Sequence, residues 1–365
     1  MPILARYVGR SIIAFTALVM AALAILFALY LFANEQDDIG VGSYGAGDAL
    51  MFSLLTLPRS LGGLLPIGAL IGALFGLGNL ARSSELTVMR AAGVSVMRIG
   101  GWAAAAGAVL AVFGWVIVDY IAPPLEHYAR QHKIFAKSND ISLTANQGAW
   151  AKDGNTFISV QQQSDDNRFG GVYVFRFDAE HRLQSVAHAR VAHADDRDDG
   201  QRSRRWRLSD YAESSLQFQD DELRVTTAKE STHELQTGLS PDFLGLAAME
   251  PDLLPGRVLF DYIRHARANA LDARLYETAL WARIARTAAL VFVVMLAVPF
   301  ALGPPRGGSP GLRTVVGSLV GVGFFVLAKI LEDGGRVFKL DPWVIAWTPT
   351  ALLAAVAFVA LARIR

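Results

Sequence analysis

The sequence predicts an α-helical membrane protein with six transmembrane helices, arranged three plus three, and a β-rich domain inserted between the two groups. Of 365 residues, 53% are hydrophobic and only 18% are charged, which is less charge than a soluble domain of this size carries. The apolar residues gather in runs of about 20, the length that crosses a bilayer as a helix. The six predicted spans cover roughly residues 11–33, 57–80, 99–122, 285–303, 312–332 and 343–362.

The first predicted domain, residues 1–122, contains three spans and a short cytoplasmic helix over 82–95. Ser83 or Ser84 is a suitable helix start, and Glu85 follows in the first turn, where the helix dipole favours an anion. The apolar positions share one face and the charged residues project elsewhere. This pattern is typical of an amphipathic helix on the membrane surface, or of a helix that docks on a separate ATPase.

Glycines recur every four residues in two of the spans, at Gly68, Gly72 and Gly76 and again at Gly317 and Gly321. Small residues at this spacing let helix backbones approach closely in lipid. The pattern fits helix packing within this chain, and it also fits an interface between subunits. The spacing alone does not decide between them.

The second predicted domain, residues 123–255, has the pattern of a β-sandwich or jelly roll. We expect Pro123 and Pro124 to stop the third helix. The stretch "GGVYVFRF" alternates apolar and polar residues, and further alternating segments follow at regular spacing. The chain has no cysteine, so this domain must fold without disulfide bonds.

The third predicted domain, residues 256–365, begins with a linker helix and continues with spans four to six. On the linker helix, Leu259, Tyr262, Ile263 and Ala266 share one face, and we expect this helix to feed the fourth span. Three cations of this domain lie near the membrane, namely Arg283, Arg286 and Lys329. They either extend toward the membrane surface or pair with an acidic residue on the same helix face. Alternatively, they contact the phosphate of an anionic substrate.

The orientation in the membrane follows from the Lys and Arg residues of the short loops. Only Arg336 and Lys339 lie in the short loops on one side. The opposite side therefore faces the cytoplasm, and it holds both termini and the helix over 82–95. Its cations are Arg6, Arg10, Arg82, Arg90, Arg98, Arg306, Arg313, Arg363 and Arg365.

The sequence contains no motif for chemistry of its own. There is no P-loop, no H-E-x-x-H and no G-x-S-x-G. The seven histidines offer no convincing set of three metal ligands, and a net charge of +1 without a basic block argues against a nucleic-acid partner. We therefore predict no catalytic residue, no metal site and no bound cofactor. A transport protein of this kind must take its energy from a separate ATPase, which would bind ATP and Mg.

Several stretches together resemble one family. "RYVGRSI", "NLARSSELTVMRAAGVS", "QGAWAKDGNTFISV" and "FGGVYVF" followed by "LQSVAHA" are similar to the lipopolysaccharide export permeases (LptF and LptG), and to the G-type more than the F-type. The similarity covers the whole chain. It implies a periplasmic β-jelly roll between two groups of three helices, in the inner membrane of a Gram-negative bacterium.

The resemblance also implies partners. One G-type and one F-type permease would sit on two copies of a cytoplasmic ATPase (LptB), which binds the ATP and Mg. A single-span jelly-roll protein (LptC) would receive lipopolysaccharide from the permease pair and pass it to a periplasmic bridge protein (LptA).

The resemblance implies three groups of site residues. The helix over 82–95 would dock on the ATPase, through Arg82, Glu85, Leu86, Met89, Arg90 and Gly93. Spans one and five would form a lateral gate. Chosen from helix position, the acyl-chain cavity would be lined by Leu26, Tyr30, Phe324, Phe325 and Leu327. Some relatives carry lysines directly after the first span, where this chain has Asp37 and Asp38, so phosphate contacts are expected at Arg283, Arg286 or Lys329 instead.

Three alternatives stay open from the sequence. The chain could be the F-type paralogue, which has the same architecture. It could be an ATP-independent secondary transporter, which would leave the helix over 82–95 without a role. It could also be a scaffold whose spans only anchor the inserted domain.

Overall fold

The computed structural model groups the chain into two units. One unit comprises Met1–Lys137, Pro255–Leu259 and Ala273–Arg365, and the other comprises Ser138–Leu254 and Phe260–Asp272. The structure describes residues 2–137, 149–164, 168–178, 180, 182–194, 204–219, 222–237, 251, 254–269, 271–302, 310–337 and 340–364.

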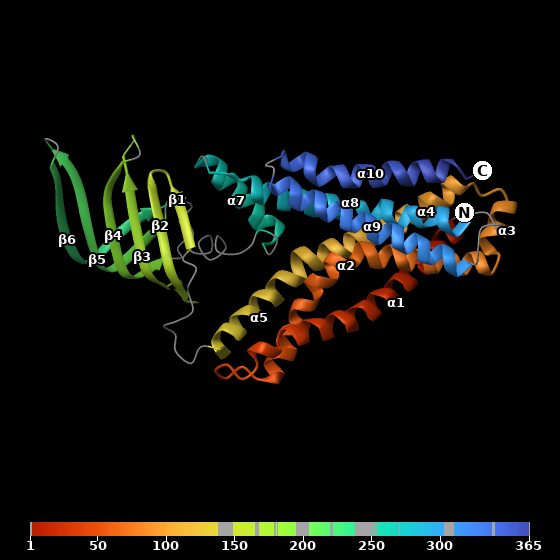
Figure 1. Ribbon diagram of the computed structural model, residues 1–365, viewed down its shortest axis with the longest axis horizontal. Helices are drawn as coiled ribbons and strands as arrows, with labels where there is room; N and C mark the ends of the chain where they lie inside the picture. The colour runs from red at the N-terminus through yellow and green to blue at the C-terminus, as the bar shows by residue number, and fades with distance from the viewer. Residues whose placement is uncertain are drawn as a thin grey trace. The chain divides into compact units, whose positions relative to one another are not determined.

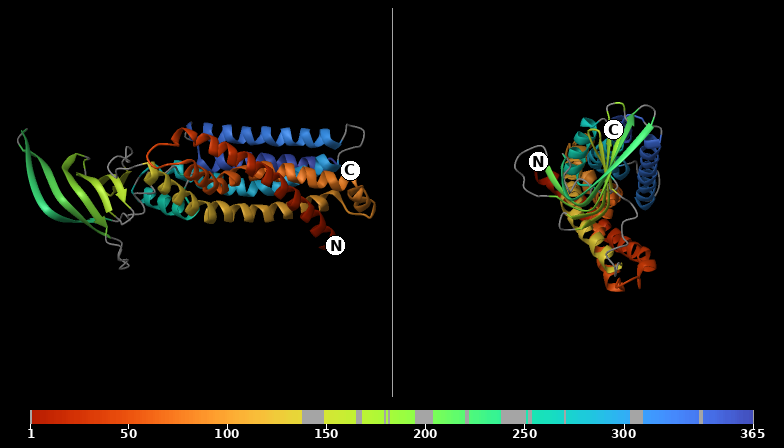
Figure 2. Two further views of the ribbon diagram at one scale, coloured as in Figure 1. Left: turned by 90° about the horizontal axis from the view of Figure 1, so that it is seen from below. Right: turned by 90° about the vertical axis from the view of Figure 1, so that its left-hand side faces the viewer.

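The first unit is a bundle of long helices (Figure 1). A 3₁₀ turn, Gln36–Asp38, follows the first helix, and a π-helical segment, Ile117–Ile121, joins α4 to α5. The two chain ends and α3 lie at the same end of this bundle, as Figures 1 and 2 both show for the termini. Its helices are α1 (Pro2–Asn34), α2 (Ala46–Arg82), α3 (Glu85–Ala91), α4 (Val96–Val116), α5 (Ala122–Lys137), α8 (Arg274–Leu302), α9 (Pro310–Val337) and α10 (Pro342–Ala362).

The predicted spans are found as helices, and most are longer than the apolar runs. Five helical stretches of the described residues are long and apolar enough to cross a membrane. In α9 the described apolar stretch is shorter, Val315–Leu331. α2 and α8 begin at Ala46 and Arg274, well before the predicted starts at 57 and 285, and the added turns contain isolated charged residues such as Asp48 and Glu277. The predicted helical membrane fold with an inserted β-domain is confirmed.

The expectation that Pro123 and Pro124 stop the third helix is wrong. α5 begins at Ala122 and continues to Lys137, so both prolines lie in its first turn. Proline lacks an amide hydrogen, and its ring clashes with the carbonyl four residues earlier, here at Asp119 and Tyr120. Those two residues belong to the π-helical segment, whose wider turn moves carbonyls away from the ring. The helix therefore continues through the proline pair.

The glycine repeats serve packing within the chain. A Cβ on Gly72 would overlap the backbone of Thr16, and one on Gly76 would lie 3.0 Å from the carbonyl oxygen of Ser11. Both contacts are with α1 of the same chain. On α9, a Cβ on Gly317 would lie 3.0 Å from Leu74. Of the two interpretations of these repeats, the structure supports packing of α2 against α1 and α9.

The second unit contains a six-stranded antiparallel sheet in which each strand pairs with the next along the chain, in the order β1 to β6 (Figure 1). The predicted inserted β-domain is present, but the described strands form one sheet in meander order, whereas the predicted β-sandwich or jelly roll has two sheets. One face carries the buried core, with Trp206 and Leu208 fully enclosed. The strands are β1 (Ala149–Asp153), β2 (Thr156–Ser164), β3 (Arg168–Phe177), β4 (Leu183–Ala194), β5 (Arg204–Gln219) and β6 (Glu222–Thr237).

The predicted linker helix is α7 (Gly256–Ala268). Three of its four predicted face residues, Leu259, Ile263 and Ala266, are buried, which confirms the helical pattern. α7 does not run into the fourth span, because the helix ends at Ala268 and α8 starts at Arg274. After the helix, the Asn269 side chain accepts a hydrogen bond from the Gly154 amide at 2.9 Å.

Candidate functional site

The short helix α3 lies between α2 and α4 and is shorter than the predicted 82–95. Ser84 precedes it in the left-handed conformation with φ 62°, and Ser83 donates a hydrogen bond to Glu85 at 2.8 Å. At its other end Gly93 has φ 86°, and the Val94 amide bonds back to the carbonyl of Met89 at 3.1 Å. A glycine with positive φ at this position is a common end of a helix.

The two faces of α3 have different roles. Leu86 and Met89 are buried in the hydrophobic core of the bundle, so they anchor α3 to its own chain. Arg82 is exposed, and Glu85 is partly exposed. Val88 is 66% exposed on α3, and sequence reasoning missed it because an apolar residue was not sought on the polar face. A partner protein could contact α3 through this exposed face.

The helical unit also contains a cavity of about 820 Å³, counting its open mouth, between α2, α8, α9 and α10. Four of the predicted site residues line it together, namely Phe324 and Phe325 of α9, Lys329 of α9 and Arg286 of α8. The remaining lining is mostly apolar, with residues such as Leu70 of α2. The cavity thus joins an apolar surface to two cationic side chains.

The cations lie toward one end of this cavity. On α9, Lys329 is the lining residue nearest the end of the helix, and Gly321 is the farthest from it. At a rise of 1.5 Å per residue, these two positions are about 12 Å apart along the axis. On α8, Arg286 and Leu296 are about 15 Å apart by the same measure. An amphiphile with an anionic head and an apolar tail matches this arrangement.

The other predicted lipid contacts are placed elsewhere. Leu26 and Tyr30 of α1 are 65% and 57% exposed, and Leu327 of α9 is 47% exposed. They lie on the surface of their helices and are not among the residues that line the cavity. If they contact lipid or another subunit, they do so on the outside of the bundle.

Arg283 forms a partly buried ion pair. Its Nη1 lies 2.7 Å from Oδ1 of Asp119, and the two side chains are 13% and 12% exposed. Asp119 belongs to the π-helical segment, so the pair joins the third and fourth spans. Among the described residues, no three His, Asp or Glu side chains gather to hold a metal ion.

Comparison with known proteins identifies the family. The family model for the lipopolysaccharide export system permease LptF/LptG matches residues 6–363. The chain belongs to the LptF/LptG permease family. It is therefore a multi-pass membrane protein of a permease family, as the motifs predicted.

Two individual relatives resemble the chain over nearly their full lengths. The lipopolysaccharide export system permease protein LptG of Escherichia coli K12 is 32% identical over 96% of this chain and 95% of the relative. LptG of Haemophilus influenzae is 31% identical over 99% of this chain and 98% of the relative.

LptF of Escherichia coli K12 is less similar, at 25% identity over 98% of this chain and 94% of that relative. The predicted closer similarity to the G-type is confirmed.

Proposed function

We propose that this chain is the G-type permease subunit of an ATP-driven exporter that takes lipopolysaccharide from the outer leaflet of the inner membrane and passes it to a periplasmic bridge. The observation that carries the proposal is the match to LptG relatives across nearly the whole chain, at higher identity than to LptF. The apolar cavity with two cations supports a lipid with an anionic head as the substrate.

We infer the partners from the same family. An F-type paralogue would complete the membrane part, two copies of LptB would bind ATP and Mg below it, and LptC and LptA would receive the lipid. The volume of about 820 Å³ counts the open mouth of the cavity, so this chain encloses the space only in part, and the paired permease would supply the remaining wall for a glycolipid with several acyl chains.

The proposed orientation in the membrane follows from the number of Lys and Arg residues in the short loops on each side. The common location of both termini and α3 at one end of the bundle (Figures 1 and 2) supports a cytoplasmic position for all three. The β-domain would then be periplasmic.

The site residues divide into three roles under this proposal. Glu85, Arg82, Arg90 and Gly93 of the α3 region would contact the ATPase, while Leu86 and Met89 hold α3 in place. Phe324 and Phe325 would contact acyl chains inside the cavity, and Leu26, Tyr30 and Leu327 would contact them on the gate surfaces of α1 and α9. Arg286 and Lys329 would contact lipid phosphate, because both line the cavity, whereas Arg283, which pairs with Asp119, is not among its lining residues.

The mechanism is mechanical. ATP binding would close the two ATPase subunits, and α3, seated on one of them, would move with it. The spans would then narrow the shared cavity and expel the lipid toward the β-domain. Energy is needed because each buried CH₂ group stabilises the bound lipid by about 0.8 kcal/mol, so lipid with several acyl chains does not leave spontaneously.

Substitution of Glu85 tests the proposal. Glu85→Ala should reduce co-purification of the ATPase at least tenfold, because a hydrogen bond to a charged group contributes about 1.5–3 kcal/mol. The released lipopolysaccharide should fall in parallel, measured with inner-membrane vesicles and ATP. The membrane level of the chain should not change, since the Glu85 side chain is partly exposed.

Glu180→Ala is the matched control, because the Glu180 side chain is 67% exposed on the β-domain and lies far from α3 in the sequence. It should leave both measurements at the wild-type value. If Glu85→Ala left ATPase retention and lipid release unchanged, the docking role would be wrong. If the wild-type complex released lipid without any ATPase, a secondary transporter would be the better reading.

A further inference from the structure

The carboxylate of Asp119 lies where three helical elements of the first unit meet. Asp119 belongs to the π-helical segment between α4 and α5, and its Oδ1 accepts a hydrogen bond from Nη1 of Arg283 on α8 at 2.7 Å. A Cβ on Gly256, the first residue of α7, would lie only 3.3 Å from Asp119 Oδ2. One carboxylate thus binds α8 and packs closely against the start of α7.

The start of α7 is a favourable place for a carboxylate. The carbonyl of Pro255 accepts a hydrogen bond from the Leu259 amide at 3.0 Å, and the amides of the first turn need partners outside the helix. These amides and the helix dipole attract a negative charge. Glycine at position 256 leaves the space that the Asp119 carboxylate occupies. The charge of Asp119 therefore acts on Arg283 and on the start of α7 together.

The segment that carries Asp119 is held firmly against α2. A Cβ on Gly62 of α2 would overlap the side chain of Val118, the residue before Asp119. Two turns further along, Oε2 of the buried Glu126 of α5 lies 3.3 Å from Nη1 of Arg59 of α2. The π-helical segment and the start of α5 therefore have a fixed position on α2.

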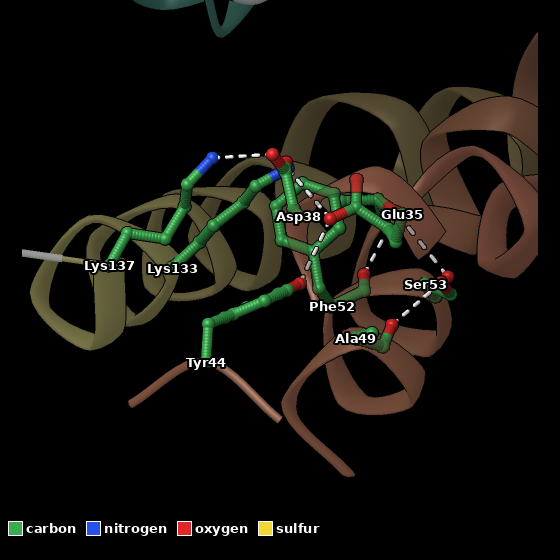
Figure 3. A network of polar contacts seen from close by, with 9 residues as sticks. Glu35, Asp38, Tyr44, Ala49, Phe52, Ser53, Lys133 and Lys137 are labelled. Carbon is green, nitrogen blue, oxygen red and sulfur yellow. Dashed lines mark hydrogen bonds and ion pairs between the residues drawn. The ribbon is translucent and has the colours of Figure 1, made fainter. Parts of the chain in front are cut away.

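The far end of α5 is held as well. Lys133 Nζ lies 2.7 Å from Glu35 Oε2 and 2.8 Å from Asp38 Oδ2, and Lys137 also pairs with Asp38. Figure 3 shows these lysines of α5 pointing toward the two acidic residues that follow α1. Contacts at both ends of α5 thus hold this helix in place, and Asp119 is attached to it.

α7 and α8 connect this point to different parts of the protein. α8 lines the cavity with Arg286, one turn after Arg283. The chain leaves the first unit within α7, after Leu259. In the second unit, Nε2 of His265 near the end of α7 lies 3.2 Å from the carbonyl oxygen of Lys152 on β1. A fixed start therefore gives the helix that leads into the β-domain a defined place beside the cavity wall.

We propose that Asp119 is a positioning residue for transport, which holds the start of α7 beside α8. The inference rests on the proposed function in one respect, that ATP hydrolysis by the partner drives lipid out of the cavity. With Asp119 in place, the start of α7 follows α8 when the cavity narrows. Without it, the start of α7 is released, and ATP is hydrolysed without a matching release of lipid.

The test measures the distance between α7 and α2 in the intact complex in nanodiscs. Spin labels are attached at Arg257→Cys and Leu50→Cys, since both positions are exposed and both belong to the first unit. This chain has no cysteine, so these are the only labels once any cysteines of the partner subunits are replaced. Asp119→Asn should at least double the width of the distance distribution. Lipopolysaccharide release should fall about tenfold, with ATPase retention and ATP hydrolysis unchanged.

Asp261→Asn is the matched control, because this aspartate also belongs to α7 but its side chain is 63% exposed. It should change neither the distribution nor lipid release. A wild-type width in folded Asp119→Asn would overturn the role of Asp119 at the start of α7. A broader distribution with normal lipid release would overturn its role in transport.

Two further variants keep the result interpretable if Asp119→Asn fails to fold. Asp119→Asn with Arg283→Gln removes both charges, and the distribution should still broaden because the anion at the start of α7 is gone. Exchange of the charges, Asp119→Arg with Arg283→Asp, restores an opposite pair between the third and fourth spans but places a cation beside the start of α7. The distribution should again be broad. A wild-type width in either folded variant would contradict the proposal.

This inference and the proposed function fail separately. If the variants broaden the distance distribution but the wild-type complex releases no lipopolysaccharide with ATP, the function is wrong and Asp119 still holds the start of α7. If the wild-type complex releases lipid and the variants neither broaden the distribution nor lower release, the positioning role is wrong and the function stands.

Discussion

At the scale of single residues, two side chains of the same type have different roles because their neighbours differ. Arg283 and Arg286 are three positions apart on α8, and the sequence assigned both the same possible role. Arg283 is paired with Asp119 at 2.7 Å, whereas Arg286 lines the cavity. A buried charge needs a partner, and only the fold brings Asp119, 164 positions away, to Arg283.

A second example at this scale is Glu213 of the β-domain. Burial acts to raise the pKa of Glu213, but hydrogen bonds from Ser185 and Tyr211 and the charge of Arg176 outweigh it and hold the pKa below its ordinary value of 4.5. The Arg176 guanidinium is 2.5 Å from Glu213 Oε1. Burial and the hydrogen bond to Glu213 raise the pKa of Tyr211 to about 12.

These shifts predict a pH dependence. A carboxyl group with a lowered pKa stabilises the folded state fully above its ordinary pKa, and the contribution is lost as pH falls through the lowered value. Wild-type protein should therefore unfold at a higher temperature than Glu213→Gln at pH 7, and the difference should shrink below about pH 4.5. Thermal unfolding of the full chain in detergent across this pH range is the measurement.

The exposed Glu180→Gln should match wild type throughout the pH series. If the difference in unfolding temperature between wild type and Glu213→Gln stayed constant down to pH 3, the charge of Glu213 would not be what stabilises the β-domain.

At the scale of elements, helix pairs are defined by close backbone approach. α2 meets α1 at Gly72, where a Cβ would lie 2.5 Å from the amide nitrogen of Thr16. At Gly68 the nearest atom is the sulfur of Met20, at the far end of a flexible side chain. The two glycines look alike in the sequence, but the structure leaves room for a side chain at Gly68 and not at Gly72.

Alanine at these two positions tests the difference. Gly72→Ala should destabilise the chain by about 1–3 kcal/mol, because the α1 backbone must move away. Gly68→Ala should lower the free energy of unfolding by less than about 1 kcal/mol, since Met20 can change rotamer. Thermal unfolding midpoints in the same detergent give the comparison, and equal losses for the two variants would contradict this account of the α1–α2 contact.

The same scale shows where local sequence rules failed. The proline pair was expected to end a helix, and it lies instead in the first turn of α5 behind a π-helical segment. The rule treats a proline as a local event. The change that accommodates the prolines is the π-helical geometry of the preceding turn, and no residue pattern predicted that geometry.

At the scale of the whole molecule, the helical unit is built from both halves of the chain and the β-domain from the segment between them. The cavity draws on α2 from the first half and on α8, α9 and α10 from the second. Neither half alone contains the whole lining. This arrangement explains why the two groups of three spans must fold together.

A chimaera tests whether the spans act or only anchor. Replacement of the helical unit by one unrelated membrane span should abolish lipopolysaccharide export, because the cavity and α3 are both removed. Complementation of a strain depleted of its own permease is the readout, with surface lipopolysaccharide measured directly. Export supported by the anchored β-domain would establish the scaffold role instead.

The sequence by itself determined the span positions, the inserted β-domain, the family and the amphipathic character of α3, because these depend on residues close together in the chain. The tertiary structure alone decided that Arg283 pairs with Asp119, which residues share the cavity, and that Leu86 and Met89 face inward. These are contacts between residues far apart in the chain. Periodicity and composition report which face of a helix is apolar, but not which distant atom lies against it.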